Sequence, residues 1–204
     1  LGDVYKRQPF TYTPSRYEEE IIAVTKHPKT IAYLGMSLDG YIADTAEGMT
    51  WLEEVKGQGD NGYGAFYDSI SSVVMGRRTY DWLIKQDLET FPYQDKDCYL
   101  LSSQPVELEK SVRLASSARL LLANLKENSK QDIWIVGGGL LISKLIQEGL
   151  LDCLQVMIAP FLLGDGVPLF TALDCPYRLK LTDCRRHGQF VELFYQIRSH
   201  SIRE

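Results

Sequence analysis

The chain has 204 residues, which is enough for one domain with a substantial core and too short for two ordinary domains. Its 45% hydrophobic, 24% charged and 11% aromatic residues indicate a soluble globular protein and exclude a disordered or low-complexity chain. The net charge of −5 argues against nucleic-acid binding, which needs a clustered basic face, and no apolar run reaches the about 20 residues that span a bilayer.

The four cysteines predict neither a metal site nor a disulfide framework. No two of them have CxxC spacing, and none of the three histidines stands at metal-ligand spacing from them. We therefore expect no metal, and free thiols in a reducing cytoplasm, although spacing alone leaves a disulfide open. The cysteines are Cys98, Cys153, Cys175 and Cys184.

Residues 1–29 are expected to form an N-terminal extension, followed by a single domain over residues 30–204. Residues 1–8 differ in composition from the rest of the chain, and we expect them to be a cloning or reading-frame remnant. Ser15 and Glu18 have the spacing of a capping box at the start of a short helix.

Strand and helix patterns alternate through the first half of the domain. Residues 30–43 begin as a buried strand and pass through a turn at Asp39-Gly40. Residues 61–70 carry aromatic residues at helical spacing, and a strand over residues 72–75 leads into a helix over residues 76–85.

The same alternation continues to the C-terminal end. Residues 97–103 are predicted to be a strand, residues 112–128 a short strand and a helix, and residues 131–150 a strand, three glycines and a helix. Residues 151–170 supply another strand and a Gly-Asp-Gly loop, and residues 177–198 form a hairpin. This order predicts an α/β fold with a mostly parallel sheet and antiparallel strands at its C-terminal end.

Two strand-to-helix junctions are candidates for chemistry. In the first, Arg77 and Arg78 follow Gly76 at a helix start, where positive side chains oppose the helix dipole unless an anion compensates them. In the second, a glycine run over residues 137–139 precedes a helix, although such runs are also common for purely structural reasons. Unpaired N–H groups at both junctions suit a dinucleotide. The glycine run does not match the Rossmann fingerprint, and the sequence contains no Walker A lysine pattern.

Six segments form a joint signal when they are taken in order: AYLGMSLDGYIA, GMTWL, VVMGRRTYDWL, YLLSSQPV, IWIVGGGLLISKLI and LLGDGVPLF. Together they resemble the dihydrofolate reductase-like superfamily, and most closely the reductase domain of bifunctional riboflavin-biosynthesis enzymes. The resemblance implies a three-layer α/β/α fold and an NADPH-dependent reductase that acts on a pteridine- or pyrimidine-like heterocycle. It also implies a homodimer.

The resemblance further implies where NADPH would bind. The turn from Gly76 to Thr79 would hold its phosphates, and paired serines would lie beside the adenosine ribose and its phosphate. The glycine run and the helix that it opens would approach the nicotinamide and the pyrophosphate, and the backbone near Gly35, with Ile42, would hold the carboxamide. The implied cofactor residues are Gly35, Ile42, Gly76, Arg77, Arg78, Thr79, Ser102, Ser103, Gly137, Gly138, Gly139, Leu140 and Leu141.

The substrate side departs further from the family. By position, Asp60 matches the carboxylate that binds a pterin and favours imine protonation, but a helix cap or a solvated loop residue explains it equally well. Asp68 is a weaker candidate for the same role. Trp51 matches a loop tryptophan near the substrate, although tryptophan is more often a core residue. Lys56 is the only basic residue of this loop, so a ribose phosphate has no evident partner there.

The leading interpretation is therefore a cytoplasmic NADPH-dependent oxidoreductase, with Asp60 and Trp51 as its catalytic-site candidates. The alternative is a non-catalytic NADPH-binding or regulatory protein that keeps the cofactor half of the site and has lost the substrate half. The expected partners are a small heterocyclic substrate and a second copy of the chain.

Overall fold

The computed structural model describes residues 27–86, 88–171 and 173–198. The short helix expected at Ser15 and Glu18 lies outside the described residues. Within these ranges, no helix combines the length and apolar character needed to cross a membrane, and no cluster of three or more His, Cys, Asp or Glu side chains could hold a metal ion. All four cysteines carry free thiols.

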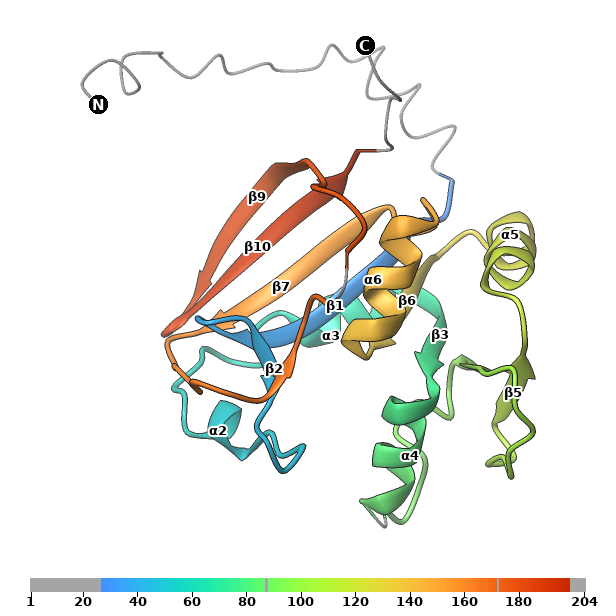
Figure 1. The fold of residues 1–204 in the computed structure, drawn as a ribbon, viewed down its shortest axis with the longest axis horizontal. Helices are drawn as coiled ribbons and strands as arrows, with labels where there is room; N and C mark the ends of the chain where they lie inside the picture. Colours follow the sequence, from blue (N-terminus) through green and yellow to red (C-terminus); the bar gives the residue numbers. More distant parts are fainter. Residues whose placement is uncertain (1–26, 87, 172, 199–204) are drawn as a thin grey trace.

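An eight-stranded sheet runs through the centre of the domain in the order β5-β4-β3-β6-β1-β7-β10-β9 (Figure 1). The strands from β5 to β7 are parallel, β10 runs antiparallel to β7, and β9 pairs antiparallel with β10. The predicted parallel sheet with a C-terminal antiparallel hairpin is therefore confirmed. The strands of this sheet are β1 (Thr30–Ser37), β3 (Ile70–Gly76), β4 (Asp97–Leu101), β5 (Val112–Ala115), β6 (Asp132–Gly137), β7 (Cys153–Ala159), β9 (Leu179–His187) and β10 (Phe190–Ile197), and a small second sheet pairs β2 (Tyr41–Ala43) with β8 (Val167–Pro168).

Helices cover both faces of the large sheet, as the predicted three layers require. On β6, Ile133 and Ile135 pack with α5 and α6, whereas Trp134 between them packs on the opposite face with α3 and α4. Because side chains alternate along a strand, the continuous apolar run of β6 fills both layers. The helices are α2 (Thr50–Glu53), α3 (Tyr63–Ser69), α4 (Arg77–Lys85), α5 (Ala118–Asn128) and α6 (Gly139–Gln147).

The pairing of β3 with β6 fixes the place where two helices begin. These strands are parallel neighbours and Met75 pairs with Gly137, so both strands end at the same edge of the sheet. Helix α4 begins at Arg77 directly after β3, and α6 begins at Gly139, two residues after the end of β6. The starts of both helices therefore meet at the carboxyl edge of the sheet, where ligands bind in open α/β folds.

Gly139 is the position at which this junction tolerates no side chain. A Cβ atom there would lie 2.5 Å from the carbonyl oxygen of Pro168 and also against that of Leu169, which is closer than real Cβ atoms approach backbone. We expect Gly139→Ala to lower the free energy of unfolding by about 1–3 kcal/mol, the usual cost of overpacking, as measured by circular dichroism melting.

Gly138→Ala is the matched control for this expectation. A Cβ atom at Gly138 would have Thr79 Oγ1 at 3.6 Å as its nearest neighbour, which is an ordinary contact. The control should therefore melt close to the parent protein. Equal melting temperatures for the two variants would show that the contact at Gly139 does not constrain the fold.

Candidate active site

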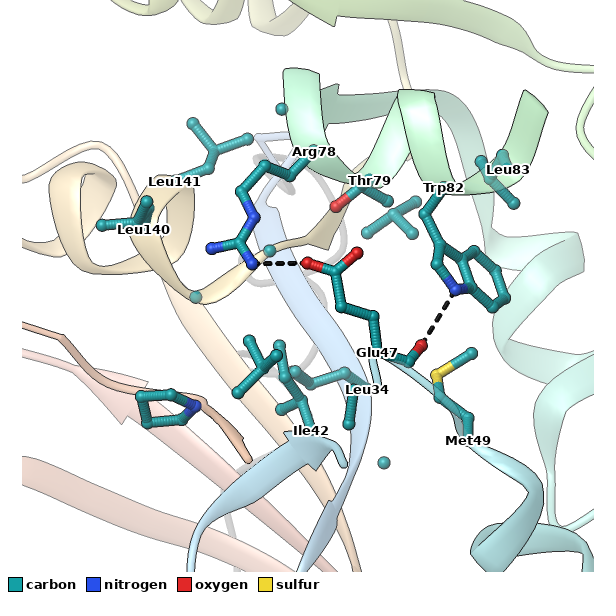
Figure 2. A pocket seen from close by; sticks show the side chains of 18 of the residues that line it. Leu34, Ile42, Glu47, Met49, Arg78, Thr79, Trp82, Leu83, Leu140 and Leu141 are labelled. Carbon is teal, nitrogen blue, oxygen red and sulfur yellow. Dashed lines mark hydrogen bonds and ion pairs between the residues drawn. The ribbon is translucent and has the colours of Figure 1, made fainter. Parts of the chain in front are cut away.

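A pocket of about 410 Å³ lies over the carboxyl edge of the sheet, and we call it the first pocket. Its walls come from the ends of β1, β3 and β6, from the starts of α4 and α6, and from the loop after β2. Figure 2 shows Arg78 of α4 facing Glu47 of that loop across the pocket. The pocket is lined by Leu34, Gly35, Ile42, Ala43, Glu47, Met49, Leu52, Gly76, Arg77, Arg78, Thr79, Trp82, Leu83, Tyr93, Val136, Gly138, Gly139, Leu140, Leu141, Val167, Pro168 and Thr171.

Both helix starts in this pocket lack a side-chain cap. Gly76 and Gly138 occupy the N-cap positions of α4 and α6 with extended backbone, and neither has a side chain that could accept from the first turn. The first N–H groups of a helix have no partner within the helix and carry partial positive charge. Gly137, which a cis peptide bond joins to Gly138, has a φ of 135°, a value that favours glycine. Two sets of amide donors are thus available to bind an anion.

The two arginines at the start of α4 differ in their partners. The Nε of Arg77 donates to both carboxylate oxygens of Asp81, one turn later in the same helix, at 2.7 and 2.8 Å. The Nη2 of Arg78 donates to Glu47 Oε1 at 2.6 Å, across the first pocket. The hydrogen bond and charge of Arg78 hold the pKa of Glu47 below its usual range, with a smaller contribution from Lys85.

The segment 44–49 forms a compact loop beside the first pocket. Asp44 Oδ1 accepts from the backbone N–H groups of Ala46 and Gly48, each at 2.8 Å, which closes the loop on itself. The backbone carbonyl of Glu47 accepts from Trp82 Nε1 at 3.0 Å. Backbone contacts therefore fix this loop against α4, independently of the Glu47 carboxylate.

A second pocket of about 570 Å³ adjoins the first. The two pockets share the lining residues Leu34, Gly35, Met49, Leu52 and Val136. Beyond these shared residues the second pocket is aromatic and acidic, with no Lys, Arg or His in its lining. Its lining residues are Tyr33, Leu34, Gly35, Met49, Leu52, Glu53, Val55, Asp60, Asn61, Tyr63, Trp134, Val136, Met157 and Phe190.

Asp60 lines the second pocket and also caps α3. Its two oxygens accept from the backbone N–H groups of Gly62 and Gly64 at 2.9 and 2.8 Å. The bonds from Gly64 and Gly62 hold the pKa of Asp60 below its usual range. At neutral pH this residue is therefore a carboxylate that can accept a hydrogen bond and has no proton to donate.

Tyr33, which lines the second pocket, is a neutral phenol near the buried carboxylate of Glu192. Burial, and next the charge of Glu192, raise the pKa of Tyr33 to about 12. Glu192 is only 3% exposed, accepts from Gln155 Nε2 at 2.6 Å, and lies 2.8 Å from His187 Nε2. Tyr33 therefore keeps its proton throughout the physiological pH range.

Several residues predicted for the site lie outside both pockets. Trp51 is buried against Phe161, in the cluster that also holds Met157 and Phe190, so it supports a wall of the second pocket from behind. Ser102 and Ser103 directly follow β4, whose last residue, Leu101, pairs with Gly76 at the end of β3. Gly137 and the alternative candidate Asp68 also line neither pocket. The remaining cofactor candidates line the first pocket.

Other residues of the site gave no local signal in the sequence. Glu47 lies in a turn, and its partner Arg78 is 31 residues further along. Trp82 has the spacing of an ordinary apolar helix residue, yet it lines the first pocket and anchors the 44–49 loop. Met157 and Phe190 belong to strands that look like core, and only the sheet order brings them to the second pocket. The one signal that could have been used is the opposite charge of Glu47 and Arg78, and it becomes informative only when the two residues are known to lie close together.

Comparisons with known proteins bear on the fold and the family of this chain. The chain is 38% identical over 169 residues to the uncharacterized protein YwjB of Bacillus subtilis, covering 82% of this chain and 97% of that protein. A structure from Shewanella sp. PV-4, whose name assigns it to riboflavin biosynthesis, is 28% identical with a TM-score of 0.75 and covers 84% of this chain and 99% of its own.

Dihydrofolate reductase from Enterococcus faecalis shows the same fold at 16% identity, with a TM-score of 0.57 and coverage of 84% of this chain and 97% of that one. The family model of the RibD C-terminal domain matches residues 84–193. This match covers more than half of the chain and includes β6 and the start of α6. The chain therefore belongs to the RibD C-terminal domain family.

Proposed function

We propose that this protein is an NADPH-dependent reductase, with the cofactor in the first pocket and a heterocyclic substrate in the second. The observation that carries the proposal is the meeting of the two pockets at Gly35, because hydride transfer needs cofactor and substrate in direct contact. The family supports a reductase, and the Enterococcus dihydrofolate reductase of the same fold is complexed with NADP(H).

The first pocket has the donors that a dinucleotide requires. The amide groups at the starts of α4 and α6, together with Arg78, would hold the pyrophosphate. Arg77, together with Ser102 and Ser103 directly after β4, would hold the 2′-phosphate of the adenosine ribose, since β3 and β4 are parallel neighbours that end at the same edge of the sheet. Ile42 and Gly35 would then contact the nicotinamide end.

The second pocket suits a planar heterocycle. Tyr33, Tyr63 and Trp134 supply aromatic surface, and their ring centroids lie 6.1–6.4 Å apart. Asp60 would accept from an N–H group of the substrate, and because it stays ionised the proton would have to come from water or from another group of the pocket. When bound, NADPH supplies a hydride to an electron-poor C=N or C=O carbon. The residues of this chain hold the two reactants face to face.

The two arginines should have separable effects on cofactor binding. We expect NADPH to bind at least about tenfold more tightly than NADH, because a charge-assisted hydrogen bond contributes roughly 1.5–3 kcal/mol. Arg77→Ala should weaken NADPH and leave NADH nearly unchanged, whereas Arg78→Ala should weaken both. Fluorescence titration gives all six dissociation constants, and equal affinity of the parent for NADPH and NADH would remove the 2′-phosphate from the proposal.

Gly138→Val tests the approach of the cofactor to the glycine run. Because an added Cβ there meets only Thr79 Oγ1 at 3.6 Å, we expect the variant to fold and to melt as a cooperative unit. The branched side chain would stand in the first pocket, so NADPH binding should fall below detection in the same titration. A folded variant that binds NADPH normally would place the cofactor elsewhere.

Asp60→Asn tests whether this residue accepts a hydrogen bond or donates a proton. Because the pKa of Asp60 lies below its ordinary value of 3.8, the residue stays ionised from pH 5 to 9 and should cause no inflection in the rate over that range. Loss of the charged acceptor should raise KM about tenfold, with kcat changing less than about threefold. Asparagine caps helices about as well as aspartate, so the fold should persist.

The opposite result has a distinct signature. If Asp60 supplies the proton, kcat of Asp60→Asn falls about 10²-fold or more, and the loss shrinks at low pH. A pH–rate profile of the parent and the variant, with any heterocycle that the parent reduces, separates the two roles. Parent protein that binds NADPH but reduces no heterocycle of a pterin and pyrimidine panel would favour the non-catalytic alternative.

A further inference from the structure

The Glu47 carboxylate forms an ion pair with the guanidinium group of Arg78, the group that would bind a phosphate in the first pocket. It accepts from Arg78 Nη2 at 2.6 Å, and both residues line the first pocket. Figure 2 shows the two side chains reaching toward each other from opposite walls, with Thr79 above their contact and Ile42 below it in this view. A phosphate bound to Arg78 at this point would meet a second negative charge.

The contact is weak enough to be exchanged. The side chains of Arg78 and Glu47 are 63% and 47% exposed, and exposed ion pairs contribute little because water screens them and both side chains lose freedom. A pyrophosphate at the same place would bind Arg78 and also the uncapped N–H groups of α4 and α6. Together these contacts contribute more binding free energy than one exposed ion pair.

The loop that carries Glu47 does not depend on this ion pair. Trp82 Nε1 holds the Glu47 carbonyl, and Asp44 closes the loop through Ala46 and Gly48. Glu47 itself adopts a φ of 62°, a conformation fixed by the loop and independent of its carboxylate. The side chain can therefore swing away from Arg78 while the backbone stays beside the pocket.

We propose that Glu47 is an internal competitor of the cofactor, a carboxylate that occupies Arg78 until the phosphates of NADPH displace it. The inference rests on the proposed function. It assigns to Glu47 the role of setting cofactor affinity: the tethered carboxylate excludes weakly bound single anions from Arg78, and only a ligand that also engages the helix starts replaces it.

The test is the affinity of Glu47→Gln for NADPH. This change removes the charge and keeps the shape and the backbone bond to Trp82. We expect NADPH to bind about three- to fivefold more tightly, the scale of one exposed ion pair. Glu54→Gln is the matched control, because it removes the same charge from an exposed residue that lines neither pocket, and it should stay within about 1.5-fold of the parent.

A double-mutant cycle shows whether Glu47 acts through Arg78. In an Arg78→Gln background, Glu47→Gln should have no further effect on the dissociation constant of NADPH. The same gain with and without Arg78, an affinity of Glu47→Gln equal to the parent, or weaker binding would each overturn the proposal. Weaker binding would mean that the ion pair is a clamp that the bound state retains.

Inorganic pyrophosphate separates this inference from the proposed function. Pyrophosphate should raise the melting temperature of Glu47→Gln more than that of the parent. It would bind Arg78 as the phosphates of NADPH do, but it has no nicotinamide and so does not depend on the rest of the cofactor site. If the parent binds no NADPH but the pyrophosphate difference is present, the reductase proposal fails, and what stands is the competition between Glu47 and a phosphate ligand for Arg78. If NADPH binds and neither probe distinguishes the variants, the competition alone fails.

Discussion

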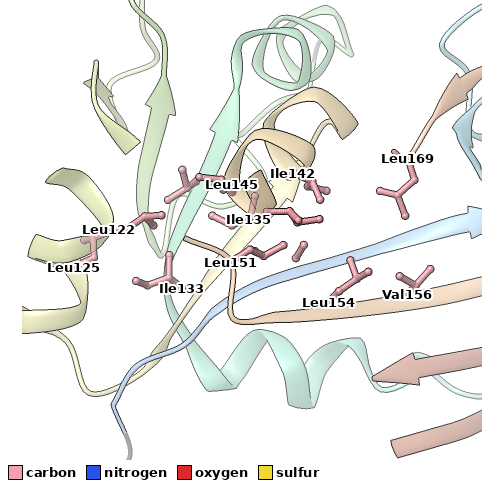
Figure 3. Packing of buried hydrophobic residues seen from close by; sticks show 13 residues of the cluster. Leu122, Leu125, Ile133, Ile135, Ile142, Leu145, Leu151, Leu154, Val156 and Leu169 are labelled. Atoms are coloured by element: carbon pink, nitrogen blue, oxygen red, sulfur yellow. The ribbon is translucent and has the colours of Figure 1, made fainter. Parts of the chain in front are cut away.

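The parallel pairing of β3 with β6 is the constraint on which the site depends. Gly76 and Gly137 end neighbouring strands at one edge of the sheet, and two helices begin there with uncapped amides that face a common pocket. The register is held by apolar side chains on both faces. Figure 3 shows one of these layers, in which Ile133 and Ile135 of β6 pack with Leu145 of α6. A shift by one residue would exchange the two faces of β6.

Much of this fold is readable from local patterns. Apolar strands followed by glycine, the arginines at the start of α4 and the C-terminal hairpin all lie within short windows of sequence, and the structure places them as expected. Local periodicity succeeds here because each central strand is buried on both faces and so appears as a continuous apolar run.

The parts that could not be predicted depend on contacts between distant residues. The partner of Arg78 lies in a turn whose sequence signals only a turn, and the second pocket is completed by Phe190, at the far end of the chain. Asp60 shows a second reason why the site could not be predicted in full. The residues around it fit a helix cap and a site residue equally well, and in the structure Asp60 caps α3 and also lines the second pocket. The two interpretations were never exclusive.

The lining residues around Gly35 that both pockets share mark the boundary between two parts of the site that can vary separately. On one side the first pocket draws on β3, β6 and the helices after them, whereas the second pocket reaches across β7 to the first residue of the C-terminal hairpin strand β10. Substitutions at Met157, Phe190 or the segment 53–63 can reshape one compartment without moving the helix starts of the other. A single scaffold of this kind can change the shape and chemistry of one pocket while the other pocket stays as it is.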